Sequence, residues 1–262
     1  MNLVTKKLFV ILSGLMLIHF SCYRDVIDLD LQDIGSQIAI EGNITDLSGP
    51  YTVKISKPVD FTKAGEFLPI SDAEVIITDN TGNSEVLQEG MDGYYRTHNL
   101  QGIPGKTYSM SVSIEGEKYS AISSMPQAIE LDSVGFISFG FEKSIICFFT
   151  DHAGVDNYCR LKIFQNGDLV YTYLYQDRYS DGSQIVIDNI DNYFYPGDHV
   201  EIQFLTIDKE IFEYFEMMSE YLESSNASAT LLTLYNPKTN ISNNALGYFS
   251  AHTLRRYSLV VQ

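Results

Sequence analysis

Apolar and polar positions alternate in short runs throughout residues 37–126. Tyr51, Val53 and Ile55 are apolar between polar neighbours, and the same two-residue period covers residues 108–114. Successive side chains of a strand point to opposite faces, so this period predicts strands that are buried on one face. Turn chemistry separates the runs, as in residues 79–83, where Asn and Gly tolerate positive φ. About seven short strands with no helical period predict an immunoglobulin-like β-sandwich.

The same alternation of apolar and polar positions continues over residues 127–262, after a connector expected at residues 127–133. Asn166-Gly167 lies between two alternating runs, residues 158–165 and 169–175, and this dipeptide is a strong hairpin signal. We therefore expect a second β-rich, sandwich-like domain. The chain shows no helix–strand alternation, which argues against a parallel α/β enzyme fold.

One stretch, residues 208–223, has a helical period. Its apolar positions recur three and four residues apart, glutamates occupy much of the rest, and Asp208 stands where an N-cap is expected. The apolar face could bind a partner protein, but we expect it to pack on its own sheet. The predicted fold is thus dominated by β-structure, with one amphipathic helix in the second domain.

The first 22 residues have the pattern of an export signal. Lys6 and Lys7 precede a short apolar run that ends at Ser21-Cys22, and the run is shorter than the ~20 residues that a spanning helix needs. We expect a signal peptide at residues 1–21, an acyl chain on Cys22 and an acidic tether at residues 22–36. An ordinary secretory signal with a chance cysteine is the alternative.

Charge narrows the classes of partner. Cleavage after residue 21 would leave 15 basic against 34 acidic residues, a formal charge of −19. Such acidity repels phosphates, so it argues against nucleic acids and anionic membrane surfaces as partners.

The sequence contains few residues or motifs that suggest chemistry. The histidines after residue 22 are isolated, and the chain has no HExxH, CxxC, Walker or G-x-S-x-G motif. We therefore expect no catalytic residues, no metal and no cofactor. Residues 177–182 faintly resemble a calcium loop, but a charged hairpin loop explains them better.

Three further features have two readings each. Tyr171, Tyr173 and Tyr175 share one strand face and form either a stacking platform for a flat ligand or cross-strand packing. Ser133 follows Asp132 in the expected connector and matches a short signal for bacterial O-glycosylation. Cys147 and Cys159 are either bridged or two small buried side chains.

Five ordered phrases carry a family resemblance. They are residues 26–31 (VIDLDL), 40–46 (IEGNITD), 49–53 (GPYTV), 100–108 (LQGIPGKTY) and the ending NIS…LGYF at 240–249. The chain resembles a Bacteroidota outer-membrane lipoprotein family that is catalogued as a domain of unknown function and is often encoded beside TonB-dependent receptors. The resemblance implies an outer-membrane lipoprotein on the periplasmic or surface side. It supplies no catalytic residues.

We accordingly expect a non-catalytic binding or assembly accessory of a TonB-dependent nutrient transporter, anchored to the membrane through Cys22. A structural or adhesin-like surface lipoprotein is the alternative. A surface hydrolase is a remote third class, because the sequence nominates no nucleophile and base.

Overall fold

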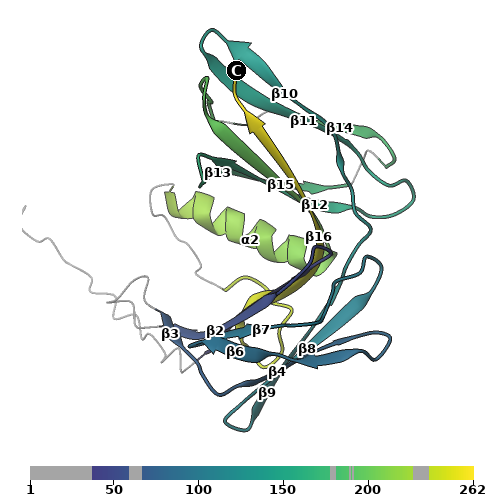
Figure 1. Cartoon of the computed structure of the whole chain (residues 1–262), viewed down its shortest axis with the longest axis vertical. Helices are drawn as coiled ribbons and strands as arrows, with labels where there is room; N and C mark the ends of the chain where they lie inside the picture. The colour runs from purple at the N-terminus through teal and green to yellow at the C-terminus, as the bar shows by residue number, and fades with distance from the viewer. Residues whose placement is uncertain (1–36, 59–66, 178–180, 189, 191, 227–235) are drawn as a thin grey trace, which may run out of the picture. The chain divides into compact units, whose positions relative to one another are not determined.

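Strands form three sheets in the computed structural model, which describes residues 37–58, 67–177, 181–188, 190, 192–226 and 236–262 (Figure 1). The expected signal peptide, Cys22 and the acidic tether lie outside these residues. The largest sheet has the order β13-β12-β15-β16-β1-β2-β7-β6, with β3 paired to β2; a four-stranded sheet has the order β5-β4-β8-β9 and a three-stranded sheet the order β10-β11-β14.

Their bounds in chain order are β1 (Ala39–Thr45), β2 (Thr52–Pro58), β3 (Phe67–Pro69), β4 (Glu74–Asp79), β5 (Ser84–Val86), β6 (Gln88–Met91), β7 (Tyr94–Arg96), β8 (Thr107–Ile114), β9 (Glu117–Ser124), β10 (Leu131–Phe139), β11 (Glu142–Thr150), β12 (Tyr158–Gln165), β13 (Asp168–Gln176), β14 (Gln184–Ile187), β15 (His199–Ile207) and β16 (Leu246–Val260). One helix is described, α2 (Lys209–Asn226).

The first hydrophobic core lies between β1, β2 and β7 of the large sheet and the four-stranded sheet. It buries alternate residues of these strands, among them Ile40, Val53 and Met110. Residues near the C-terminal end of the chain join this core, because Ile241 and Phe249 are buried in it as well. The second core lies between β12, β15 and the three-stranded sheet and buries Phe149, Leu161 and Phe204.

The strand β16 takes part in both sandwiches. Its first seven residues pair in parallel with the whole of β1, from Ala39↔Leu246 to Thr45↔His252. The following eight pair antiparallel with β15, from Thr206↔Thr253 to His199↔Val260. Since side chains alternate along a strand, one face of β16 supplies Phe249 to the first core and Tyr257 to the second.

The opposite face of the large sheet meets α2. A third cluster joins Ile211 and Phe212 of the helix to Tyr158, Leu205 and Leu254 of the sheet. Asp208 caps the helix, because its Oδ1 accepts a hydrogen bond from the Ile211 N–H at 3.0 Å. Its Oδ2 accepts bonds from Ser123 Oγ at 2.6 Å and the Ser124 N–H at 2.9 Å, so the same carboxylate also fixes β9 to the start of the helix.

The expected fold class is confirmed: strands dominate, two sandwich-like cores form, and one amphipathic helix follows. The helix packs on its own sheet, as expected. The connector expected at residues 127–133 is wrong in its last three residues, because β10 begins at Leu131. No helix of the described residues is both long and apolar enough to cross a membrane.

Candidate functional site

The covered face of the large sheet carries an unusual group of polar side chains. On β12, Arg160 and Lys162 alternate with the buried Cys159, Leu161 and Ile163, so both cations project from the face toward α2. Together with His252 and Ser250 of β16 and Phe215 of α2, they line a cavity of about 160 Å³, which we call the cationic pocket. Asn43, Gln203 and Tyr248 add further polar atoms to its wall, and Leu205, Ile207 and Leu254 add apolar ones.

Arg160 is held by stacking. Its guanidinium carbon lies 3.6 Å from the centre of the Phe215 ring. Tyr248 extends this aromatic wall, with its ring centre 5.0 Å from that of Phe215. The Arg160 Nε atom is buried and has no hydrogen-bond partner, although a buried donor without a partner carries a free-energy penalty.

The Lys162 side chain also lacks a partner. In the part of the chain that the structure describes, it forms no hydrogen bond or ion pair. Burial, with Arg160 as a second cause, lowers the pKa of Lys162 to about 8. Burial likewise lowers the pKa of Arg160. Two like charges on one strand face thus destabilise each other, since no carboxylate compensates them.

His252 is neutral at pH 7. Burial, reinforced by the positive charge of Lys162, lowers its pKa to about 4. The Nδ1 atom lies 2.9 Å from Ser250 Oγ, two residues away on the same strand. An imidazole with so low a pKa is a weak general base at neutral pH, so this Ser–His contact orients the ring rather than activating the hydroxyl.

Two acidic side chains, Asp46 and Glu41, act on residues of the pocket wall, but neither lines the cavity. Asp46 Oδ2 forms an ion pair of 2.7 Å with Arg255, and its Oδ1 accepts a bond from the Leu254 N–H at 2.9 Å. Glu41 is exposed on β1. The cationic pocket therefore offers unpaired positive charge, apolar walls and several hydroxyl and amide groups.

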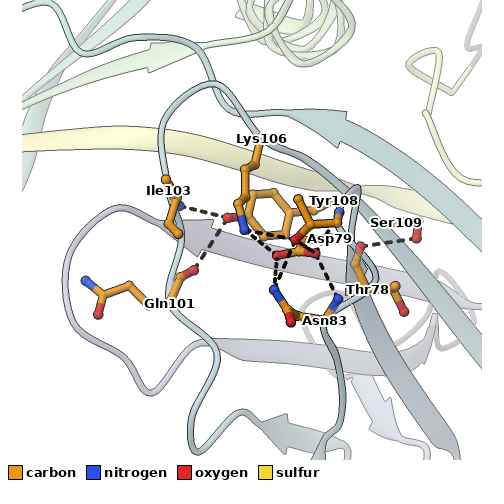
Figure 2. A network of polar contacts seen from close by, with 9 residues as sticks. Thr78, Asp79, Asn83, Gln101, Ile103, Lys106, Tyr108 and Ser109 are labelled. Carbon is orange, nitrogen blue, oxygen red and sulfur yellow. Dashed lines mark hydrogen bonds and ion pairs between the residues drawn. The ribbon is translucent and has the colours of Figure 1, made fainter.

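In a second charged cluster, around Asp79, the charged groups are paired, unlike those of the cationic pocket. Asp79 lies at the end of β4 and is 8% exposed, and Lys106 Nζ donates to its Oδ2 at 2.6 Å (Figure 2). Asn83 Nδ2 also donates to Oδ2, while the N–H groups of Thr81 and Asn83 donate to Oδ1. The Lys106 ammonium, followed by these bonds, holds the pKa of Asp79 far below its usual range. Every strong acceptor here has a partner, so the cluster stabilises a turn and offers no binding site.

The tyrosines that the sequence singled out face the second core. Tyr171, Tyr173 and Tyr175 pair with Ile163, Leu161 and Cys159 of β12 and pack against the buried cluster. Tyr175 is buried, and its ring meets that of Phe149 edge-on at 5.1 Å. These contacts are those of cross-strand packing, and ligand binding by the three rings stays a prediction.

Ser133 is exposed on β10, next to a register shift in its pairing with β11. Its hydroxyl is accessible there, and O-glycosylation stays a prediction. Cys147 and Cys159 are free and buried. Burial raises the pKa of Cys147 to about 12 and also raises that of Cys159, so neither thiol is ionised at neutral pH.

Asp151 is a further buried carboxyl, 4% exposed, near Asp177. It accepts a bond of 3.3 Å from the Tyr175 hydroxyl. Burial, followed by the charge of Asp177, raises the pKa of Asp151. Among the described residues, no three His, Cys, Asp or Glu side chains gather as a metal ion requires.

Nothing in the sequence singles out Arg160 or Lys162, which are simply the polar positions of an alternating strand. An indirect signal was available, because a helix that packs on its own sheet must cover some outward-facing positions of that sheet.

The fold and the pocket define a β-sandwich protein with one helix-covered sheet face and a small polar cavity under the helix. The chain belongs to the family described as "Domain of unknown function (DUF4249)", whose model matches residues 24–258. The comparison with curated proteins gives no match.

Two solved structures illustrate the structural comparison. A pullulanase from Anoxybacillus sp. LM18-11, complexed with maltotriose, is 12% identical, with 64% of this chain and 24% of that chain covered, at a TM-score of 0.22. The FN1–FN3 domains of chicken CNTN1 are 9% identical, with 65% and 60% covered, at a TM-score of 0.25. The chain thus spans about a quarter of the length of the pullulanase and less than two thirds of the length of the CNTN1 fragment. At these TM-scores neither carries an argument about activity or ligand.

Proposed function

We propose that the chain is a lipid-anchored outer-membrane protein that acts as a non-catalytic binding or assembly accessory of a TonB-dependent nutrient transporter in Bacteroidota. Cys22 would carry the acyl chains, and residues 22–36 would space the folded part from the bilayer. The apolar run that ends at Ser21-Cys22 and the ordered phrases of the sequence support this anchoring and this setting.

One observation carries the binding part of the proposal. Arg160 and Lys162 share a half-enclosed cavity, and neither side chain has a polar partner among the described residues. Proteins depart from the rule that buried charges are paired mostly at functional sites, where a ligand can supply the missing partner. The pocket supplies charge and hydrogen-bond donors, whereas its one Ser–His contact has a poorly basic imidazole. This combination favours binding over catalysis.

Co-purification tests the partner. The full chain, tagged after Gln262 and expressed at its native level, should recover a β-barrel receptor from membranes dissolved in mild detergent. A Cys22→Ala chain should leave the membrane fraction and lose that receptor. If the native chain recovers no receptor, and its deletion alters surface attachment but leaves nutrient uptake intact, the adhesin-like alternative replaces the transporter role.

A further inference from the structure

The charge of the cationic pocket contradicts the charge of the chain around it. The protein has 34 acidic and 17 basic residues, yet two of its few cations share a pocket without a carboxylate. Buried charges in proteins are normally paired. The titratable groups that interact with them are His252, Tyr214 and Tyr248, none of which carries negative charge at neutral pH. Asp46 and Glu41 act on these groups, but neither carboxylate lines the pocket.

The geometry of Arg160 selects a kind of ligand. Its guanidinium stacks on the Phe215 ring, so the ring covers one face and leaves the edge of the planar group for hydrogen bonds. The Nε–H is buried without a partner, so it is the two terminal nitrogens of Arg160, which form no hydrogen bond within the described residues, that supply this edge to the pocket. A guanidinium edge donates two parallel bonds to two oxygens of one oxyanion, and this geometry favours phosphate, sulfate and carboxylate groups. Lys162, two residues along the same strand face, adds a point charge beside it.

The size of the cavity suits a small oxyanion. Its volume of about 160 Å³ is ample for a tetrahedral oxyanion, and the cavity is partly enclosed between the strands and α2. A larger ligand could place a terminal anionic group between the strands and α2, beside Arg160 and Lys162.

We propose that the cationic pocket binds a small oxyanion with two negative charges, a phosphate or sulfate group, between Arg160 and Lys162. Two cations beside a neutral His252 require two negative charges for balance, which a single carboxylate does not supply. Ser250, Asn43 and Gln203 line the pocket and can bond the remaining oxygens. This inference deepens the proposed binding role and rests on it, but it requires neither the membrane anchor nor a transporter.

Calorimetric titration of the full chain in detergent tests the proposal. Inorganic phosphate and sulfate, added at constant ionic strength, should each bind at one site, and acetate should bind at least tenfold more weakly. Lys162→Met should weaken phosphate binding at least tenfold, whereas the exposed Lys118→Met, with the same loss of charge, should not. Arg160→Lys keeps the charge but loses the planar edge, and it should also weaken binding.

Glucose 6-phosphate separates the two sources of the group. Binding as tight as that of phosphate identifies a terminal group of a larger ligand, and its exclusion identifies the free ion. Phosphate binding that is unchanged by Lys162→Met, or no saturable heat with phosphate and sulfate, would overturn the proposal. Because no receptor is present, this failure is distinct from a failed co-purification.

Discussion

The guanidinium carbon of Arg160 lies 3.6 Å from the ring centre of Phe215, so a cation of β12 is held under the helix α2 by an aromatic face. The contact compensates part of the cost of burying the charge, but it leaves the donors on the edge of the group unpaired. Lys162 adds a second uncompensated charge on the same strand face. The pocket is therefore expected to reduce the stability of the unliganded fold.

Lys162→Met should stabilise the unliganded protein at neutral pH. The pKa of Lys162 in the folded protein, about 8, lies below the ordinary 10.5. The free-energy cost of burying its charge is therefore complete below pH 8 and disappears as the pH rises to 10.5. Methionine keeps the apolar stem and removes the charge. We expect a gain of about 1 kcal/mol in the free energy of unfolding, or roughly 2–4 °C.

Urea unfolding at pH 7 and pH 10 measures this gain, which should shrink at the higher pH. The exposed Lys118→Met serves as the control. A loss of stability at pH 7 would show that Lys162 has a stabilising partner.

His252 should make the fold sensitive to acid. The pKa of His252 in the folded protein, about 4, lies below the ordinary 6.5. The stability that the neutral imidazole contributes is therefore complete above pH 6.5 and is lost as the pH falls toward 4. The loss should approach roughly 3 kcal/mol, at about 1.4 kcal/mol for each pKa unit. His252→Gln, which can still bond Ser250, should flatten the stability profile between pH 6.5 and 4.5. The exposed His98→Gln should leave the slope unchanged, and an equal slope in both variants would refute the assignment.

Asp151 should have the opposite effect to His252 on how stability changes with pH. Its pKa is raised, so its contribution is present at low pH and is lost as the pH rises through the folded pKa. Asp151→Asn should therefore stabilise the protein at pH 7, because the buried side chain then carries no charge. Thermal unfolding at pH 7 and pH 4 measures the difference, with the exposed Asp156→Asn as control. A destabilised variant at pH 7 would mean that the ionised carboxylate is needed there.

Gly247 should be indispensable to the pairing of β1 with β16. Its φ is +91°, and a Cβ atom would lie 2.1 Å from the Ile40 carbonyl oxygen. Gly247→Ala should cost more than about 2 kcal/mol, because backbone strain adds to a collision with a neighbouring strand. Gly116→Ala is a matched control, since its φ is +90° but no atom lies within 4 Å. Equal denaturation midpoints for the two variants would contradict the close approach.

Local features were predictable from the sequence. Asn166 and Gly167 adopt positive φ at the expected hairpin, and Asp208 caps the expected helix. Such features depend on a few adjacent residues whose backbone preferences are strong. The expected closing segments, residues 246–249 and 253–261, also lie in a strand, except for Val261.

The partners of those segments were not predictable. They form one strand, β16, which pairs in parallel with β1 about 200 residues earlier in the chain and antiparallel with β15. Alternation shows which face of a strand is apolar but not which distant strand lies beside it. The cationic pocket depends on this pairing, because His252 reaches Lys162 only across β15. For the same reason the site could not be read from spacing alone.

The Nε–H resonance of Arg160 in a ¹⁵N-labelled full chain tests the central claim most directly. This buried donor has no partner in the protein, and an oxyanion bound to the same guanidinium would change its electrostatic surroundings. Titration with phosphate should shift the resonance to a saturating value, and the shift should vanish in Lys162→Met but persist in Lys118→Met. A resonance that stays fixed while phosphate saturates the protein would contradict the account, because the ion would then bind elsewhere.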